Sequence, residues 1–451
     1  MALFGTDGIR GLANRELTAE LALNVALATA HVLLSNKAAN NKRPHAIVGQ
    51  DSRASGEFLE AAVVAGLTSA GIDVYRVGVL PTPAIAYLVG ETGADLGVMI
   101  SASHNAMPDN GIKIFARGGE KLDDKIEAAI EARVAELKSG IDWQRPTGAD
   151  VGRAIVDENA SEKYLAHLLS SVKTPLKGLK IVVDCANGAS SVVAPESLRR
   201  AGAQVIAIYN SPNGWNINDG CGSTHLDKLR EAVAKESADF GIAHDGDADR
   251  CLAIDGKGND VDGDVIMTIL ALGFKARGAL TSNTIVGTVM SNLGFMKAMK
   301  EADINVVTTA VGDRYVLEEM LKKNYALGGE QSGHLIMREF ANTGDGILTA
   351  LALAQEVAKS GKPLHELASA MHRFPQILIN VKDVNKEKLD GSQAIKEAVR
   401  SAEDSLGDKG RVLLRASGTE PLVRVMVEAQ SDNLAKEIAT SLAKVVEAEL
   451  R

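Results

Sequence analysis

Three aspartates occupy alternate positions in one short polar segment, His244 to Arg250. Because small residues separate them, the carboxylates of Asp245, Asp247 and Asp249 can converge from a single loop on one hard cation. All the ligands on offer are oxygen atoms, and three monodentate carboxylates leave octahedral positions for water or a phosphate oxygen, which favours Mg²⁺ over Ca²⁺. The apolar run Phe240 to Ala243 directly before the loop predicts a buried strand that positions it.

A serine follows a second apolar run in a similar position. The segment Ser101 to Asn105 comes directly after Leu96 to Ile100, and open α/β sheets expose their ligand crevice at the carboxyl ends of strands. His104 beside Ser103 could activate the hydroxyl or balance charge, and Lys113 could stabilise a phosphate. The sequence has no GxSxG elbow, so the segment does not indicate acyl transfer.

Two glycine-containing segments could also contact a ligand. In Gly328 to His334, the side chains of Glu330 and Ser332 can hydrogen-bond to hydroxyl groups, and the flanking glycines let backbone approach closely, a combination that would suit a sugar. Near the N-terminus, the glycines of Phe4 to Gly11 could fold Arg10 back toward a site.

A further segment has the composition of an anion site. Arg415 to Pro421 combines a guanidinium, hydroxyl groups and glycine backbone, and Arg424 follows three residues later. An ordinary turn needs neither two arginines nor the sequence Ser417-Gly418-Thr419. We therefore predict a loop that holds a phosphate dianion without a P-loop lysine.

The residues around these segments predict alternating strands and helices. Strands are expected where short apolar, β-branched runs end in Gly, Asn or Asp, and helices where apolar residues recur with helical spacing. This alternation indicates α/β layers in the first four fifths of the chain. The expected strands are Ala46 to Val48, Val74 to Val79, Leu96 to Ile100, Ile181 to Val183, Val205 to Tyr209, Phe240 to Ala243 and Ile285 to Val289, and the expected helices include Thr18 to Leu34, Glu57 to Ala70, Leu122 to Lys138, Glu196 to Ala201 and Leu226 to Lys235.

Polar segments rich in Gly and Pro divide the chain near residues 139–157 and near residue 257, and the pattern becomes α+β from Phe374 onward. In this last part, strands are expected at Ile377 to Val381, Val412 to Leu414 and Val423 to Val427, before a helix from Asp432 to Arg451. We predict four domains, 1–155, 156–257, 258–371 and 372–451, which carry the serine, aspartate, sugar and phosphate segments in that order.

Composition limits the partners. Among 451 residues, 45% are hydrophobic and 24% charged, which is typical of a globular protein with several cores. With 49 Lys and Arg against 58 Asp and Glu, the net charge is −9, and no basic run indicates binding to nucleic acid or to a membrane surface. No stretch suits a membrane span, and Asp7 and Arg10 interrupt any signal peptide. Three scattered cysteines predict neither a disulfide framework nor a thiolate metal site, so a reducing, cytoplasmic setting is expected.

The serine, aspartate, sugar and phosphate segments together resemble the α-D-phosphohexomutase superfamily over the whole chain. Within it, the chain is most similar to the bacterial phosphoglucosamine mutases, through Cys221-Gly222-Ser223-Thr224-His225, Val311-Gly312-Asp313-Arg314-Tyr315-Val316, Gly329-Glu330-Gln331-Ser332-Gly333-His334 and Phe374-Pro375-Gln376. The resemblance implies a heart-shaped protein of four domains around a central cleft, three α/β and the fourth an α+β domain related to the TATA-binding-protein fold.

The resemblance also implies roles for individual residues. Ser103 would carry the phosphoryl group, and Asp245, Asp247 and Asp249 would hold Mg²⁺ together with a phosphoserine oxygen. Glu330 and Ser332 would contact sugar hydroxyls. The non-reacting phosphate would be held by Arg415, Ser417, Gly418, Thr419 and Arg424. Positioning and acid–base work would fall to Arg10, His104, Lys113, Arg250 and His334.

Two positions depart from the superfamily pattern. Ala106 stands where proline is usual after Ser-His-Asn, which would loosen the serine segment. Gln50 precedes Asp51-Ser52-Arg53 where a basic residue is common, which would remove a charge near the cleft.

The implied activity is the interconversion of glucosamine 6-phosphate and glucosamine 1-phosphate. Phosphorylated Ser103 would phosphorylate the free hydroxyl, and the resulting glucosamine 1,6-bisphosphate would turn over and return its other phosphoryl group to Ser103. The product would feed UDP-N-acetylglucosamine and cell-wall precursor synthesis. Expected cofactors are Mg²⁺, phosphorylated Ser103 and a hexosamine or glucose 1,6-bisphosphate primer. A homodimer and an activating kinase are further expectations.

Three alternatives remain open on the sequence. A phosphoglucomutase or phosphomannomutase differs mainly in the substituent at C2 of the sugar. A phosphatase could use Asp245 as the nucleophile of an Asp-x-Asp pair, and it would then survive Ser103→Ala. A silent sugar-phosphate sensor would bind substrate without converting it.

Overall fold

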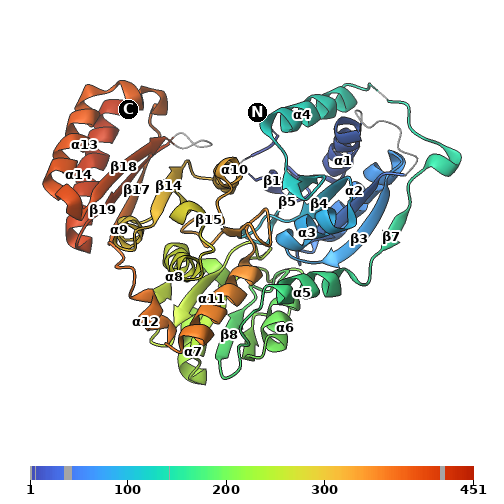
Figure 1. The fold of residues 1–451 in the computed structure, drawn as a ribbon. Coiled ribbons are helices and arrows are strands. Elements are labelled where there is room, and N and C mark those ends of the chain that lie inside the picture. The colour runs from blue at the N-terminus through green and yellow to red at the C-terminus, as the bar shows by residue number, and fades with distance from the viewer. Residues whose placement is uncertain (1–2, 6, 35–42, 142, 417–421) are drawn as a thin grey trace. The chain divides into compact units, whose positions relative to one another are not determined.

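The computed structural model describes residues 3–5, 7–34, 43–141, 143–416 and 422–451, and the strands among them form four sheets (Figure 1). Two units pack separately. One comprises Met1–Met290 with Asn305–Ser369, and the other comprises Ser291–Ile304 with Ala370–Arg451. The first three sheets lie in the first unit and the fourth in the second.

The first sheet has the order β1-β5-β4-β2-β3-β7, and β6 pairs with β5. Strand β4 is buried along its whole length, as expected for a parallel strand with both faces covered. Strands β2, β3 and β7 run parallel to β4, whereas β5 is antiparallel to β4 and β1. The elements are β1 (Ile9–Leu12), α1 (Ala19–Leu34), β2 (His45–Gln50), α2 (Ser55–Ser69), β3 (Asp73–Val79), α3 (Thr82–Thr92), β4 (Leu96–Ile100), β5 (Asp109–Ala116), β6 (Glu120–Lys121), α4 (Asp124–Lys138) and β7 (Ala154–Val156).

Two of these elements differ from the sequence-based expectation. Strand β5 is not among the strands expected from the sequence; it begins at Asp109 and includes Lys113, and its residues Ile112 and Ile114 are buried. Strand β7 lies inside the punctuated segment 139–157 and extends the first sheet to Val156 by pairing with β3.

The second sheet has the order β12-β11-β10-β8-β9, in which β8, β9 and β10 are parallel. Strand β10 is buried throughout and delivers the segment that begins at His244. The elements are α5 (Ala160–Ser170), β8 (Lys180–Asp184), α6 (Val193–Arg200), β9 (Gln204–Ile208), α7 (Asp227–Glu236), β10 (Phe240–Ala243), β11 (Leu252–Asp255) and β12 (Asp260–Val261).

The third sheet has the order β14-β13-β15-β16. Helices α8 and α11 begin at N-caps in which an aspartate, Asp262 or Asp345, accepts backbone N–H groups of the first turn. The elements are α8 (Gly263–Ala276), β13 (Thr284–Thr288), β14 (Asn305–Thr309), α10 (Asp313–Lys323), β15 (Leu327–Gly329), β16 (Leu335–Met337), α11 (Gly346–Ser360) and α12 (Leu364–Ala368).

The second unit is a three-stranded antiparallel sheet, β17-β19-β18, with helices α13 and α14 against it. Helix α9 belongs to this unit although β13 and β14 flank it in sequence. Asn292, directly before α9, exchanges hydrogen bonds with Phe374, and Leu293 donates to Glu428. The elements are α9 (Leu293–Glu301), β17 (Gln376–Lys382), α13 (Gln393–Leu406), β18 (Arg411–Ala416), β19 (Leu422–Glu428) and α14 (Asp432–Leu450).

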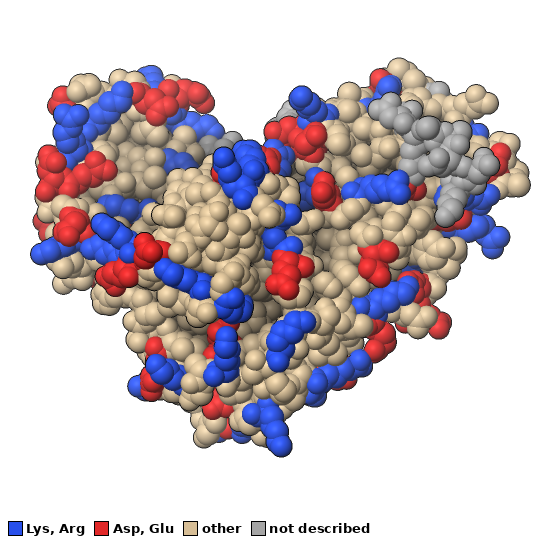
Figure 2. All heavy atoms as spheres, viewed as in Figure 1, with Lys and Arg blue, Asp and Glu red and all other residues tan. Residues whose placement is uncertain are grey.

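The expected strands and helices named from the sequence are all present, with ends that shift by a few residues. Across the described ranges, every helix is too short or too polar to span a bilayer. On the face shown in Figure 2, Lys and Arg side chains are interspersed with Asp and Glu side chains.

Candidate active site

The serine loop, Ser101–Asn105, is a tight turn at the carboxyl end of β4. Ser103 is only 1% exposed and has a φ of 53°, in the left-handed region that residues other than glycine seldom adopt. Its backbone N–H donates to Ser101 Oγ at 2.9 Å, and Ser101 Oγ donates in turn to Asp51 Oδ2 at 2.6 Å. These bonds hold an uncommon backbone conformation and leave the Ser103 hydroxyl free to point away from its own loop.

Arg53 supports the serine loop through hydrogen bonds, a role that the sequence analysis did not predict. It is one of the largest fully buried side chains, and its Nε pairs with Asp51 Oδ2 at 3.0 Å. The guanidinium donates to the carbonyl oxygens of Ser103 (3.1 Å), Asn105 (2.8 Å), Ala106 (2.6 Å) and Asp109 (3.0 Å). The signal was available in the sequence, because Asp51-Ser52-Arg53 follows the predicted strand at Ala46 to Val48.

Asn218 is a second, unpredicted clamp on the same loop. Its Nδ2 donates to Ser103 O at 2.8 Å and to Asn105 O at 3.1 Å, so the second sheet's connections also fasten the serine loop. Only the tertiary structure brings residues this far apart in sequence together.

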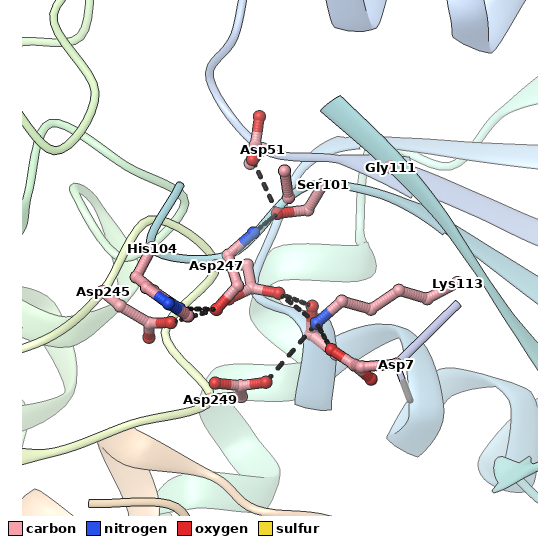
Figure 3. A network of polar contacts seen from close by, with 12 residues as sticks. Asp7, Asp51, Ser101, His104, Gly111, Lys113, Asp245, Asp247 and Asp249 are labelled. Atoms are coloured by element: carbon pink, nitrogen blue, oxygen red, sulfur yellow. Dashed lines mark hydrogen bonds and ion pairs between the residues drawn. The ribbon is translucent and has the colours of Figure 1, made fainter. Parts of the chain in front are cut away.

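The aspartate loop, His244–Arg250, meets the serine loop as predicted (Figure 3). Oxygen atoms of Asp245, Asp247 and Asp249 lie within 4.8 Å of one another, and the three side chains are buried. Ser103 Oγ donates to Asp245 Oδ2 at 2.5 Å. The structure thus joins the serine to the three aspartates.

The three carboxylates suit a hard divalent cation. Asp247 Oδ1 and Asp249 Oδ1 are buried oxygen atoms without a hydrogen-bond partner, which is costly unless something else binds them. Burial, together with the charges of Asp249 and Asp247, raises the pKa of Asp245 to about 8. A cation of the Mg²⁺ class would relieve both the repulsion and the unpaired oxygens.

Lys113 supplies positive charge from strand β5. Its Nζ lies 2.8 Å from Asp247 Oδ2, 2.8 Å from Asp7 Oδ2 and 3.5 Å from Asp249 Oδ2. Burial disfavours its charge, but these carboxylates outweigh burial and hold the pKa of Lys113 well above its ordinary value. Lys113 is therefore a fixed cation beside the aspartate loop (Figure 3).

Two arginines lie beside the same groups, as predicted. Arg250 Nε is 4.0 Å from Asp245 Oδ2 and 3.8 Å from Asp249 Oδ1. Arg10 Nη2 pairs with Asp7 at 2.8 Å, and its Nη1 lies 3.4 Å from Ala102 O. Because both side chains are partly exposed, they can also reach a bound anion.

The two predicted histidines occupy different environments. His104 Nδ1 is 3.5 Å from Ser103 Oγ, and burial with the nearby charges of Arg250 and Arg10 lowers the pKa of His104 to about 4. His334 Nδ1 lies 3.7 Å from Asp249 Oδ2. Burial disfavours its charge, but the hydrogen bond to Asp249 and the charge of Asp313 raise the pKa of His334.

The sugar loop, Gly328–His334, is fastened to the aspartate loop through backbone. Cys251 N donates to Gly333 O at 3.0 Å, and Gly333 has a φ of 91° with no space for a side chain. Glu330 accepts the N–H of Gly312 at 2.9 Å, and Ser332 Oγ is a buried atom without a hydrogen-bond partner. A ligand hydroxyl would satisfy Ser332.

The predicted phosphate loop is described only in part. Arg415 and Arg424 stand directly opposite each other on the antiparallel strands β18 and β19, so their side chains share one face of the sheet. Ser417, Gly418 and Thr419 lie outside the described residues.

The two departures from the superfamily pattern lie at the serine loop. Ala106 is exposed and keeps its carbonyl bonded to Arg53, so the loop has a support other than proline. Gln50 Oε1 is a buried atom without a hydrogen-bond partner.

Other residues near the centre were not predicted. Thr82 Oγ1 donates to Asp247 Oδ2 at 2.5 Å, and Lys121 contacts both Asp7 and Asp313. No local motif marks Thr82. It lies at the start of helix α3, and only the tertiary structure brings it to the aspartate loop.

Models of one protein family match the chain over most of its length. Residues 1–140, 162–258 and 262–374 match the models of the phosphoglucomutase/phosphomannomutase alpha/beta/alpha domains I, II and III, and residues 378–445 match the C-terminal domain. The phosphoglucosamine mutase of Streptomyces griseus is 59% identical over 448 residues, which cover 99% of this chain and 99% of that protein.

Solved structures show the same fold. A phosphoglucomutase/phosphomannomutase family protein from Burkholderia thailandensis matches with a TM-score of 0.82 at 22% identity, over 99% of this chain and 97% of that one. The N-acetylphosphoglucosamine mutase of Aspergillus fumigatus, solved in complex with GlcNAc-6P and magnesium, matches with a TM-score of 0.70 at 18% identity, over 100% of this chain and 96% of that one. The chain therefore belongs to the phosphoglucomutase/phosphomannomutase family.

Proposed function

We propose that this chain is a phosphoglucosamine mutase, which interconverts glucosamine 6-phosphate and glucosamine 1-phosphate through phosphorylated Ser103. One observation carries the proposal. The buried Ser103 hydroxyl meets the three-aspartate cluster at 2.5 Å, in a chain that is 59% identical over almost its whole length to proteins of that name. The amino-sugar substrate follows from this relationship, and the serine route follows from the geometry.

The proposed transfer moves a phosphoryl group between Ser103 Oγ and a sugar hydroxyl. In the first half, the P–O bond to Ser103 breaks and a bond forms to the 1-hydroxyl of glucosamine 6-phosphate, whose proton is released. The second half transfers the 6-phosphoryl group to Ser103, which leaves glucosamine 1-phosphate. Phosphoryl transfer depends mainly on alignment and charge neutralisation, for which the clamped serine loop and the buried cation Lys113 are suited.

Asp245, Asp247 and Asp249 would hold Mg²⁺ together with a phosphoserine oxygen. When bound, the ion would neutralise charge on the phosphoryl group. The residues of this chain then orient the reactants: Thr82 and Lys113 fix Asp247, and Arg250 lies against Asp245 and Asp249. His104, at 3.5 Å from Ser103 Oγ, is a candidate proton acceptor outside the three aspartates.

Both phosphoryl transfers take place at one site, so the remaining contacts must hold the sugar in two orientations. Glu330 and Ser332 would bond sugar hydroxyls in either orientation, and the partnerless Ser332 Oγ supports this role. Arg415, Arg424 and the segment Ser417-Gly418-Thr419 would hold whichever phosphate is not reacting. The two arginines share one face of the sheet, as a dianion site requires.

Several expectations remain predictions. They are the bisphosphate primer, an activating kinase, a homodimer, a cytoplasmic location, the product's use for UDP-N-acetylglucosamine synthesis, and the domain boundaries near residues 155, 257 and 371.

The test is ³¹P NMR of the purified protein with Mg²⁺, glucosamine 6-phosphate and a trace of glucose 1,6-bisphosphate. We expect wild type to form glucosamine 1-phosphate and Ser103→Ala to be inactive. Ser360→Ala, the same substitution at the end of helix α11, is the matched control and should retain activity. Conversion that survives Ser103→Ala, or release of inorganic phosphate, would contradict the proposal and favour Asp245 as a phosphatase nucleophile.

The same assay separates the sugars. Glucose 6-phosphate and mannose 6-phosphate should turn over more slowly than glucosamine 6-phosphate when kcat/KM is compared. Faster turnover of either would assign the chain to phosphoglucomutases or phosphomannomutases. Binding of glucosamine 6-phosphate without conversion would indicate a sensor.

A further inference from the structure

Six ionisable side chains form a closed ring behind the aspartate loop, in which His334 Nε2 also accepts the N–H of Gly344 at 3.0 Å. Negative carboxylates alternate with Lys or His side chains around it. In order they are Lys113, Asp7, Lys121, Asp313, His334 and Asp249, with Asp249 next to Lys113 again. Figure 3 shows the part of the ring in which Lys113 lies between Asp7 and Asp249. The proposed function uses Lys113 and Asp249, and the family resemblance implies a positioning or acid–base role for His334, but Lys121 has been given no role.

Strand pairing places Lys121 on the same side as Lys113. The short strand β6 pairs with β5 so that Lys121 lies opposite Phe115, two residues from Lys113, and residues two apart on a strand share a face. The hairpin between the strands is constrained: at Gly119, φ is 78° and a Cβ atom would lie 2.1 Å from Ala86 O. Lys121 thus reaches the ring from a fixed backbone.

Lys121 joins the carboxylates that contact the two other basic groups. Its Nζ donates to Asp7 Oδ1 at 2.6 Å, while the other oxygen of Asp7 accepts from Lys113. The same Nζ also donates to Asp313 Oδ2, and that oxygen lies 3.3 Å from His334 Nε2. The Lys121 ammonium therefore contacts both Asp7, which pairs with Lys113, and Asp313, which pairs with His334.

The environment of Lys121 makes this connection strong. Its side chain is 15% exposed and that of Asp313 is 13% exposed, so water screens their attraction weakly. Burial disfavours the charge, but Asp313 and Asp7 outweigh it and raise the pKa of Lys121, which stays a cation at neutral pH. Removing the ammonium would leave two partly buried carboxylates facing each other.

We infer that Lys121 is a positioning residue: through Asp7 and Asp313 it holds Lys113 and His334 on the two sides of Asp249. The inference rests on the proposed function, since it concerns the rate of that reaction. Because the Lys121 ammonium is engaged by Asp7 and Asp313, we expect it to act on kcat and not on KM.

The test compares Lys121→Met, which keeps the length of the side chain and removes its charge, with Lys121→Arg. We expect Lys121→Met to lower kcat by roughly 10–100-fold, the usual loss when an outer partner of a site is removed, with KM for glucosamine 6-phosphate unchanged. Lys121→Arg should recover part of kcat, because it restores the cation.

Arg314→Met is the matched control. Arg314 also joins α10 to α4, through Asp124 at 2.6 Å and Glu127 at 3.9 Å, and its side chain does not contact a ring carboxylate in the described residues. It should keep the wild-type kcat even if it lowers the unfolding temperature. Equal losses of kcat in Arg314→Met and Lys121→Met would overturn the inference, because the loss would then follow general loosening.

A double variant tests the route through Asp313. If Lys121 and Asp313 act as one unit, Lys121→Met with Asp313→Asn should lower kcat little more than the worse single variant. Fully multiplicative losses would mean separate roles and would contradict the inference. So would a rise in KM with kcat unchanged.

A spectroscopic readout is independent of turnover. The ¹⁵N shifts of the His334 imidazole, assigned with a His334→Gln variant, should change in Lys121→Met and not in Arg314→Met. If wild type fails to convert glucosamine 6-phosphate, the proposed function fails but this shift still tests the ring. If wild type converts the sugar and neither kcat nor the shift responds to Lys121→Met, only the positioning inference fails.

Discussion

Two regions of the molecule hold their charges in opposite ways. Around Ser103, aspartates alternate with Lys and Arg, most of these side chains are buried, and each cation contacts a carboxylate. On strands β18 and β19, two arginines stand directly opposite each other, half-buried, on one face of a sheet. The first region therefore brings opposite charges together, whereas the second brings two like charges together, an arrangement that an anion would stabilise.

This difference matches the two tasks of a mutase. A reacting centre must keep its geometry while charge moves, which favours groups locked by several partners. A site that accepts two different phosphates in turn must bind each by charge and then release it, which favours partly exposed guanidiniums. The predictions below test whether the buried region responds through stability and rate, and the arginine pair through substrate affinity.

The largest effect is expected from Arg53→Met. The substitution leaves Asp51 as a buried carboxylate without its cation and removes the donors to four carbonyl oxygens, two in the serine loop and two in the residues that follow it. The free energy of unfolding should fall by about 3–5 kcal/mol, and mutase activity should be lost. Urea unfolding and the ³¹P assay measure the two effects. Arg53→Lys keeps the charge but not the forked geometry, so retention of full activity by Arg53→Lys would refute the clamp.

A pH effect is expected from Asp184 at the end of β8. Burial, opposed by the N–H groups of Gly222 and Ala186, raises the pKa of Asp184 to about 6. A carboxyl group with a raised pKa in the folded state contributes stability below its unfolded pKa near 4, and this contribution is lost as the pH rises through 6. The stability of wild type relative to Asp184→Asn should therefore fall by about 3 kcal/mol between pH 4 and pH 7. Urea unfolding at both pH values checks this, and a constant difference would contradict it.

Arg424→Gln should act mainly on affinity. Removing one charged donor to a phosphate costs about 1.5–3 kcal/mol of binding, so KM for glucosamine 6-phosphate should rise roughly tenfold or more, with little loss of stability. Lys444→Gln on the exposed face of α14 removes the same charge from the same unit and serves as the control. If Arg424→Gln instead unfolds the protein at normal KM, the arginine pair is structural and the comparison breaks down.

The smallest effect is expected in the salt dependence of stability. Arg415→Gln removes one of two like charges placed directly opposite on neighbouring strands. This repulsion costs about 0.2–1 kcal/mol and is screened by salt, so raising the ionic strength should stabilise wild type relative to Arg415→Gln by up to about that amount. Thermal unfolding at two salt concentrations measures it, and equal salt effects in the two proteins would contradict the repulsion.

Much of the site was predictable because its chemistry is local. The alternation of Asp245, Asp247 and Asp249 after an apolar strand predicts a cluster, and the structure gathers their oxygens within 4.8 Å. The position of Ser103 after β4 predicts a loop at the carboxyl end of that strand, whereas its contact with Asp245, which follows a strand of another sheet, was implied only by the family resemblance. Neighbouring residues on a strand or loop must share a region, so spacing alone carries this information.

The sequence by itself predicted the candidate reacting groups, and it determined the α/β pattern and the strands that deliver the serine and aspartate loops. Only the tertiary structure decided which buried groups support them: Arg53 and Asn218 under the serine loop, Lys121 and Asp313 behind the aspartate loop, and the packing of α9 with a unit distant in sequence. The physical reason is that a buried charge gains stability from whichever partner the fold brings within contact, and that partner can lie anywhere along the chain.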